Sequence, residues 1–543
     1  MKRNLVAVLL ATAMLTSALA GCGKTNQEEV NASSTSTNVE SSETVAESVS
    51  EPVEEEKPTY PLDTDVTFTY FMEPNTNWTS YAQNFGETEI AKALEEKTGV
   101  KIEYIHPAAG QASTQLSLYA ASGELPDLVE TDWYSYTGGP ELAIQDGLII
   151  SLNEYLESGE LPNLKAFLDA NPEIARSCRT EEGNYYCFPF IRGDAKLMMS
   201  SGPIIRKDWM EELGLEMPET IEDMENILMQ FKEKKGTTSP LCVNFPNALM
   251  FAGAYNNMYV DNGVVKYGVL DDCFKTAVET LNRWYANGLL DENFSSVKTA
   301  DKQAAILTEK AGVTMGSGGG NLGGWIDSMK DSGTSFDLTG FRLPYAVYLG
   351  NVSDAYPGAG SVAISAACKD PLTAAKYLDY GYSEEGIMLY NFGIEGVSYT
   401  MVDGKAIYTD EIQANPDGLT QAQAMMKYFR ASNQGPFIQD VGYIEQYYAK
   451  PQQQEALAAW TTDFDVYNSR RYPKATMTAE ENEEYSTIYN EIEGYVDEQV
   501  TMFILGTRSL DEYDDFITEV KKLGAERAVE LKQAALDRYL ANK

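Results

Sequence analysis

Strand-like and helix-like patterns alternate along residues 65–131, and this alternation limits the chain to few folds. The predicted elements are a strand over 65–71, a helix over 87–98, a strand over 100–105, a helix over 111–122 and a strand over 127–131. The two helical patterns stop at Gly99 and Gly123, the residue type expected after a helix C-terminus. The order β-α-β-α-β predicts a parallel, doubly wound α/β sheet, whose ligands lie beyond the carboxyl ends of the strands.

The N-terminus has the pattern of an export signal. Met1-Lys2-Arg3 is basic, and the apolar stretch over residues 5–20 is too short to span a bilayer comfortably. We therefore predict a cleavable signal peptide over residues 1–21 and a protein that acts outside the cytoplasm. The tetrad Leu19-Ala20-Gly21-Cys22 resembles a bacterial lipobox, in which the cysteine is lipidated, so Cys22 is the expected membrane anchor. An ordinary signal peptide that ends near a cysteine is the alternative.

An acidic segment rich in Ser and Thr follows over residues 22–60. Such a segment buries too little apolar area to offset the entropy of ordering it, and its like charges keep it extended. We predict a disordered tether that carries the folded part. The remaining chain is too long for one ordinary core and predicts two lobes. After the leader, no apolar run reaches the length of a membrane span.

The formal net charge of the chain is −41. Nucleic acids and acidic polymers are recognised through clustered Lys and Arg, so binding of either is not expected. Neutral and cationic ligands remain compatible with this charge.

The sequence offers little catalytic or metal-binding chemistry. His106 is the only histidine and lies at the end of a predicted strand, where a loop or surface role is expected. The cysteines after Cys22 have no metal-ligand spacing, so we predict no catalytic residue, no metal site and no cofactor. Cys178 and Cys187 flank a predicted hairpin, where a disulfide and two buried free thiols both stay open. A glycosidase pair of carboxylates also stays open, because some pair lies close in any chain this acidic.

Two glycine-containing segments lack the residue spacing of phosphate-binding and calcium-binding loops. The run over residues 312–324 lacks the spacing of a phosphate-binding loop, and we predict a flexible loop near a ligand cleft. Asp261-Asn262-Gly263 predicts a hairpin turn, since the other oxygen ligands of a calcium loop are missing.

Five fragments along the folded region carry a further signal. They are Leu125-Pro-Asp-Leu, Gln145-Asp-Gly-Leu-Ile-Ile-Ser-Leu-Asn-Glu, Ile205-Arg-Lys-Asp-Trp-Met-Glu-Glu-Leu-Gly-Leu, Leu281-Asn-Arg-Trp-Tyr-Ala-Asn-Gly-Leu-Leu-Asp and Asn391-Phe-Gly-Ile-Glu-Gly-Val-Ser-Tyr. In order and number they resemble the family 1 extracellular solute-binding lipoproteins that serve ABC importers, in particular the large carbohydrate-type branch of Gram-positive bacteria.

The resemblance implies a two-lobed periplasmic-binding-protein-like fold of type II, each lobe a doubly wound α/β sheet with flanking helices. It implies lobe 1 over 61–190 and 358–435, and lobe 2 over 191–357 and 436–543. It also implies a non-catalytic, monomeric receptor on the extracellular face of the cytoplasmic membrane, with an ABC permease as its partner. The helical spacing of Leu, Tyr and Phe over residues 509–539 predicts extra C-terminal helices packed on lobe 2.

Aromatic and polar side chains occur together after the predicted strands, at the expected crossing between lobes near residue 192, and beside the glycine-rich run. Flat rings suit the apolar faces of a sugar, and Asp, Asn or Arg suit its hydroxyl groups. The predicted ligand-binding residues are Asn77, Trp78, Asp132, Trp133, Tyr134, Arg192, Asp194, Tyr255, Trp325 and Tyr356. For each aromatic residue, a packed core or surface position is the alternative.

These observations together predict a lipid-anchored receptor that captures an extracellular solute, foremost an oligosaccharide, between two lobes. One alternative is a surface-anchored glycoside hydrolase or lyase. Another is a receptor of the same fold for peptides or cationic solutes, because an aromatic cage in an acidic protein also suits a cation.

Overall fold

A computed structural model of the chain describes residues 58–346, 353–356 and 358–541. The chain divides into one unit over residues 1–54 and a second over residues 55–543, and the second holds every described residue. Cys22, the predicted signal peptide and nearly all of the predicted tether lie outside the described residues.

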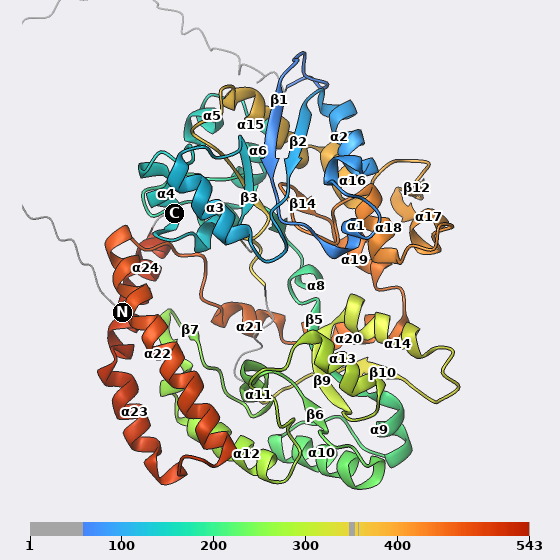
Figure 1. Cartoon of the computed structure of the whole chain (residues 1–543), viewed down its shortest axis with the longest axis vertical. Helices are drawn as coiled ribbons and strands as arrows, with labels where there is room; N and C mark the ends of the chain where they lie inside the picture. Colours follow the sequence, from blue (N-terminus) through green and yellow to red (C-terminus); the bar gives the residue numbers. More distant parts are fainter. Residues whose placement is uncertain (1–57, 347–352, 357, 542–543) are drawn as a thin grey trace, which may run out of the picture. The chain divides into compact units, whose positions relative to one another are not determined.

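The first sheet contains the β-α-β-α-β unit that the sequence predicts (Figure 1). Its strands, in the order β11-β3-β1-β2, are β11 (Ser361–Ile364), β3 (Leu128–Thr131), β1 (Thr67–Phe71) and β2 (Lys101–Ile105). β1 pairs in parallel with β2 and β3, whereas β11 is antiparallel to β3. The connecting helices α2 (Glu89–Thr98) and α3 (Ala112–Ser122) end at Gly99 and Gly123, whose φ angles are 76° and 70°. The prediction for residues 65–131 is therefore confirmed.

The second sheet is mixed. Its strands, in the order β10-β5-β9-β6, are β10 (Leu338–Gly340), β5 (Ser201–Arg206), β9 (Val313–Ser317) and β6 (Leu241–Cys242). β5 is antiparallel to both of its neighbours, and β6 is parallel to β9.

Each of the two sheets has its own hydrophobic core. One core contains the side chains of β1, β2, β3 and β11, and a larger core contains those of β5, β6, β9 and β10 together with the C-terminal helices. A third, smaller core lies where Leu197, Phe429 and Ile444 meet. Two separate sheet cores make this a two-lobed α/β fold. The exact residue boundaries of the lobes stay a prediction.

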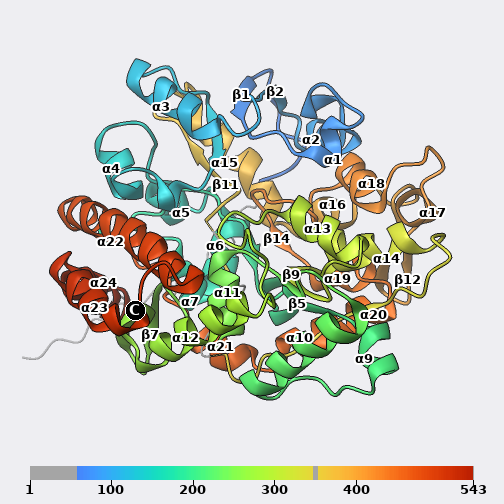
Figure 2. The ribbon, with the colours of Figure 1, turned by 60° about the horizontal axis from the view of Figure 1, so that its bottom comes forward.

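Apart from α2 and α3, the chain forms further helices, and those at the C-terminus pack together as a layer. The longer ones are α6 (Pro162–Ala170), α10 (Ile221–Lys235), α12 (Asp272–Ala286), α13 (Thr299–Leu307), α15 (Pro371–Asp379), α16 (Glu384–Phe392), α18 (Gln421–Tyr428), α20 (Pro451–Thr461), α22 (Ala479–Leu505), α23 (Tyr513–Lys522) and α24 (Ala525–Ala541). α22, α23 and α24 pack against one another, and α22 also packs on α12 (Figures 1 and 2). The extra C-terminal helices predicted from the spacing of residues 509–539 are present.

Three short strand pairs complete the fold. They are β4 (Ile191–Arg192) with β14 (Ile438–Gln439), β7 (Met258–Asp261) with β8 (Val264–Tyr267), and β12 (Tyr399–Val402) with β13 (Lys405–Tyr408). The turn between β7 and β8 has φ angles of 52° at Asn262 and 82° at Gly263, so the predicted hairpin is confirmed. The β4–β14 pair places Arg192 opposite Gln439, residues far apart in the sequence.

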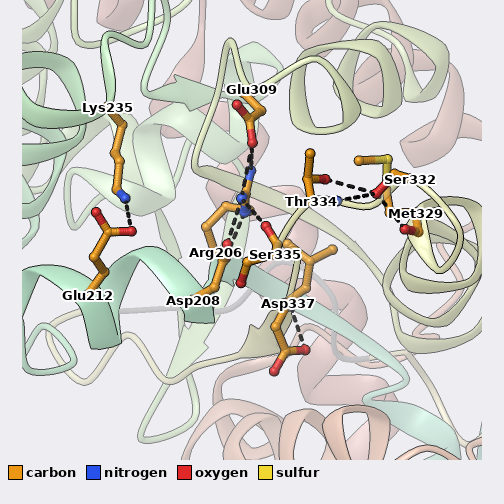
Figure 3. A network of polar contacts seen from close by, with 11 residues as sticks. Arg206, Asp208, Glu212, Lys235, Glu309, Met329, Ser332, Thr334, Ser335 and Asp337 are labelled. Atoms are coloured by element: carbon orange, nitrogen blue, oxygen red, sulfur yellow. Dashed lines mark hydrogen bonds and ion pairs between the residues drawn. The ribbon is translucent and has the colours of Figure 1, made fainter.

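Arg206, in the third of the five sequence fragments, has a structural role (Figure 3). It ends β5, is fully buried, and donates hydrogen bonds of 2.8 and 2.7 Å to the two carboxylate oxygens of Asp208. Its guanidinium also lies 4.0 Å from the ring centre of Trp209. These contacts fix α9 (Lys207–Leu213) to the end of β5, so this fragment is a signature of the fold.

The glycine-rich run over residues 312–324 is not the flexible loop that its composition predicts. It forms β9, a π-helical turn (Gly318–Gly323) and the start of α14 (Gly324–Met329). A Cβ atom on Gly318 would lie 2.4 Å from the ring of Tyr448, and one on Gly319 would lie 2.6 Å from the ring of Tyr447. Glycine at these two positions therefore permits close packing on tyrosine rings.

Cys178 and Cys187 are buried free thiols, the second of the two alternatives that the sequence left open. The hairpin between them is present, because Arg179 and Tyr185 form an antiparallel bridge. His106 is half-buried: its Nε2 accepts from the Phe85 N–H and its Nδ1 lies 3.1 Å from the Met72 carbonyl oxygen. Burial lowers the pKa of His106, which suits a neutral, structural ring.

Candidate functional site

A cavity of about 390 Å³ lies where β4, β14 and α19 (Val441–Tyr447) meet the π-helical turn after β9. We call it the tyrosine cavity. Its lining residues are Arg192, Leu197, Ser200, Ser317, Gly319, Gly320, Ala431, Ser432, Asn433, Gln434, Gln439, Tyr443, Ile444, Tyr447 and Tyr448. Segments from both halves of the chain therefore contribute to one hollow.

Three tyrosines form an aromatic wall of this cavity. Tyr443 and Tyr447 are four residues apart, which places them on one face of α19, and their rings stack with centres 5.8 Å apart. Tyr448 lies 5.6 Å from Tyr447 and donates a hydrogen bond of 2.8 Å to the Ser200 carbonyl oxygen. Tyr447 is only half-buried, so its ring is the accessible part of the wall.

Three buried polar atoms of the same cavity have no hydrogen-bond partner among the described residues. They are Nε of Arg192, Oε1 of Gln439 and Oγ of Ser432: a donor, an acceptor and a hydroxyl group that is both. The Gln439 amide is held in place, because its Nε2 donates to the Ala431 carbonyl oxygen at 2.6 Å. Buried polar atoms in proteins are nearly always satisfied, so these three indicate a polar ligand or water in the cavity.

A second cavity of about 260 Å³ has a different chemistry, and we call it the lysine cavity. Its lining residues are Tyr134, Tyr255, Asn257, Met258, Asp354, Arg471, Tyr472, Pro473, Lys474, Tyr485 and Lys532. An adjoining cavity of about 410 Å³ shares Tyr134, Tyr485 and Lys532 with it. Both aromatic rings and cations therefore line this cavity.

Four of the residues predicted from the sequence lie at these cavities. Arg192 lines the tyrosine cavity, whereas Tyr134 and Tyr255 line the lysine cavity. Asp132 lies beside the lysine cavity, where its charge acts on Lys474. A role of these residues in ligand binding stays a prediction.

Four predicted aromatic residues are buried in this conformation. The exposed fractions of Trp78, Trp133, Trp325 and Tyr356 are 1%, 0%, 2% and 1%. Trp133 donates from Nε1 to the Val129 carbonyl oxygen at 3.0 Å, and the Tyr356 hydroxyl lies 3.2 Å from the Cys187 sulfur. Their rings contact protein here, and neither cavity is lined by any of the four.

Asn77 and Asp194 belong to the starts of short helices. Asn77 lies in α1 (Thr76–Thr79), where its N–H donates to the Asn75 side chain at 2.8 Å. Asp194 precedes α8 (Ala195–Met198) and accepts from the Lys196 N–H at 2.8 Å. Neither residue lines the two cavities, so their ligand-binding role also stays a prediction.

The sequence reasoning missed the residues that dominate both cavities: Tyr443, Tyr447, Tyr448, Lys474 and Lys532. A signal for the first three existed, because three tyrosines in six residues, two of them four apart, form an aromatic face on a helix. Nothing local distinguishes Lys474 and Lys532 from other lysines.

Comparison with known proteins identifies the family. Residues 77–388 match the family model described as bacterial extracellular solute-binding protein, and the chain belongs to this family. It is a solute-binding protein of an extracellular family, as the fold and the solute-sized cavities indicate. No helix among the described residues combines the length and the apolar character that a membrane span requires.

Relatives cover most of the chain. The fructooligosaccharide ABC transporter substrate-binding protein FusA of Streptococcus pneumoniae serotype 4 is 26% identical over 500 residues, which are 84% of this chain and 88% of FusA. Lipoprotein LipO of Bacillus subtilis is 22% identical over 457 residues, 80% of this chain and 86% of LipO. The crystal structure of the alginate-binding protein AlgQ2 superimposes with a TM-score of 0.71 at 23% identity, covering 89% of this chain and 100% of AlgQ2. This structural likeness supports the type II two-lobed fold.

Proposed function

We propose that this protein captures an extracellular oligosaccharide in the tyrosine cavity and delivers it to an ABC permease. One observation carries the proposal: Arg192 Nε, Gln439 Oε1 and Ser432 Oγ have no hydrogen-bond partner in the described part of the chain, and they lie beside a wall of three tyrosines. A pyranose or furanose ring presents C–H groups on its faces and hydroxyl groups on its rim. The similarity to FusA, a fructooligosaccharide ABC transporter substrate-binding protein, and to the alginate-binding protein AlgQ2 supports a carbohydrate ligand.

Each part of the cavity has a role in this proposal. The half-buried ring of Tyr447 stacks on a sugar face, and Tyr443 holds that ring from behind. Arg192 donates to a sugar oxygen and Gln439 accepts from a hydroxyl group, so one hydroxyl-bearing ring satisfies both. A ligand that contacts segments of both lobes stabilises the closed arrangement over the open one.

The test is a thermal-shift screen across neutral and charged oligosaccharides, followed by calorimetry on the best binder. Tyr447→Ala should lower the affinity at least tenfold, because it removes the stacking surface, and the melting temperature of the ligand-free variant measures separately the loss of its packing on Gly319. Tyr285→Ala is the matched control, since Tyr285 is a half-buried tyrosine on α12 that lines neither cavity. Equal affinity of Tyr447→Ala and wild type would overturn the placement of the ligand.

We also propose that the protein does no chemistry on its ligand. Within the described ranges, no group of His, Cys, Asp and Glu side chains is arranged to hold a metal ion, and His106 is engaged in backbone hydrogen bonds. Prolonged incubation should leave a bound oligosaccharide intact. If new reducing ends appear, and substitution of one carboxylate near the cavity abolishes them, the protein is a hydrolase.

The proposal includes a lipid anchor on Cys22, followed by the acidic tether, and a monomeric receptor. Two acyl chains hold a soluble domain stably on a membrane. Cys22→Ser should therefore release the protein into the medium with an unchanged melting temperature. Equal membrane retention of wild type and Cys22→Ser would contradict the anchor.

A further inference from the structure

The lysine cavity concentrates positive charge in a chain whose net charge is −41. The ammonium group of Lys474 lies 4.2 Å from the ring centre of Tyr134. The ammonium group of Lys532 lies 4.8 Å from the ring centre of Tyr472 and 4.6 Å from that of Tyr485. Both lysines are half-buried, and both line the cavity. Their heads are therefore directed to a shared hollow with aromatic walls.

Neither ammonium group has an ion-pair partner in the part of the chain that the structure describes. Arg471, a third cation of the same cavity, is paired with Asp354. Asp132 lies near Lys474, but one of its oxygens accepts from the Ser135 hydroxyl at 2.8 Å and no ion pair with Lys474 forms. The lining of the cavity therefore holds two lysines with no ion pair among the described residues and one arginine paired with Asp354, an excess of positive charge that suits an anionic group.

The lowered pKa of Lys532 also supports an anion site in this cavity. Burial and the neighbouring charge of Lys474 lower the pKa of Lys532 to about 8. Burial also lowers the pKa of Lys474, against the opposing effect of Asp132. Two like charges held together without an anion are unfavourable, and an anion between them would reverse that effect.

The net charge of the whole chain does not forbid such a ligand. Charges more than about 8 Å away are largely screened at physiological salt, whereas a bound anion would lie within a few ångströms of the lysines, in a partly desolvated hollow. The expectation that acidic polymers are excluded comes from composition, which averages over the surface. The field at a cavity depends on the few groups that line it.

One short segment, residues 353–355, contacts Arg192 of the tyrosine cavity and also contributes to the lining of the lysine cavity. Arg192 of the tyrosine cavity donates from its backbone N–H to the Ala355 carbonyl oxygen at 2.7 Å and from Nη1 to the Ser353 hydroxyl at 3.4 Å. Asp354, between these two residues, lines the lysine cavity. A ligand of several sugar units in the tyrosine cavity therefore has the lysine cavity close by.

We propose that the lysine cavity binds a singly charged oxyanion on the sugar ligand, a carboxylate or a sulfate ester, and that the captured oligosaccharide is therefore acidic. This inference rests on the proposed function and names its substrate class. The oxyanion lies between Lys474 and Lys532, whose ammonium groups the rings of Tyr134 and Tyr485 hold in place. No covalent step is involved.

The test compares charged oligosaccharides with neutral counterparts of the same shape by calorimetry. One pair is trigalacturonate and its methyl ester, and the other is a sulfated galactose trisaccharide and its desulfated form. At least one charged member should bind ten or more times as tightly as its counterpart, and the pair that shows the preference distinguishes a carboxylate from a sulfate.

Lys474→Met and Lys532→Met should each bring the ratio of charged to neutral affinity close to one. Lys101→Met is the control, since Lys101 is an exposed lysine on β2 and its loss changes the net charge equally. A preference that persists in both variants, or neutral members that bind as tightly as the charged ones, would overturn the inference and leave the proposed function standing. Absence of binding to every oligosaccharide would overturn both.

Discussion

Arg430 donates from Nη1 and Nη2 to the two carboxylate oxygens of Glu130, at 3.0 and 2.7 Å, although 300 residues separate them. Arg430 is 2% exposed, and the same carboxylate accepts a 2.6 Å hydrogen bond from the Tyr70 hydroxyl. The pair ties the end of β3 to the segment that follows α18. The pair therefore links the first sheet to the segment around residue 430.

Arg430→Met should lower the free energy of unfolding by about 3–5 kcal/mol, because it leaves the buried Glu130 carboxylate without its counter-ion. Urea unfolding without ligand measures the change. Arg527→Met is the matched control: Arg527 pairs with Glu484 at the surface, where solvent screens the charges, so its loss should change the stability far less. Similar losses in the two variants would show that Glu130–Arg430 behaves as a surface pair.

Gly318→Ala should destabilise the protein by about 1–3 kcal/mol, because the new methyl group would lie 2.4 Å from the Tyr448 ring and force it to move. Displacement of Tyr448 should also weaken oligosaccharide binding in the tyrosine cavity. Gly320→Ala is the control, since its Cβ would meet nothing nearer than the Ser317 hydroxyl at 3.9 Å. Thermal unfolding of the two variants decides, and equal melting temperatures would refute the packing argument.

Trp133→Ala should cost about 3–5 kcal/mol of folding stability, because the ring is fully buried and its N–H is bonded to the Val129 carbonyl oxygen. Measuring unfolding without ligand and affinity by calorimetry separates a core role from a ligand role. A small change in stability with a large loss of affinity would return Trp133 to the binding residues predicted from the sequence.

Lys532→Met should stabilise the ligand-free protein by about 1–2 kcal/mol at pH 7, with allowance for the partial exposure of the side chain. The folded-state pKa of Lys532, about 8, lies below its ordinary value of 10.5. Between these values the unfolded chain binds more protons, so the wild type gains stability as the pH rises. The advantage of Lys532→Met is therefore complete below pH 8 and should shrink from pH 8 to 10. A difference that is constant across this range would contradict the perturbed pKa.

The sequence alone determined the features that depend on neighbouring residues. The strands and helices of residues 65–131 follow from apolar spacing, because each element buries one face and its period fixes which side chains lie there. Gly99, Gly123 and the Asn262-Gly263 turn follow from backbone sterics, since they adopt positive φ angles. The family resemblance depends on fragments of the same kind, such as the one in which Arg206 binds Asp208.

Only the tertiary structure decided which chemistry lies together. Trp133 follows β3 and Tyr447 ends α19, yet the first is fully buried and the second lines a cavity, because burial depends on segments that pack from far along the chain. The composition predicts a mobile loop for residues 312–324, whereas packing on Tyr447 and Tyr448 orders it. Net charge likewise does not predict which charged side chains lie close together. Lys474 and Lys532 line one cavity because of long-range contacts, which no local sequence pattern predicts.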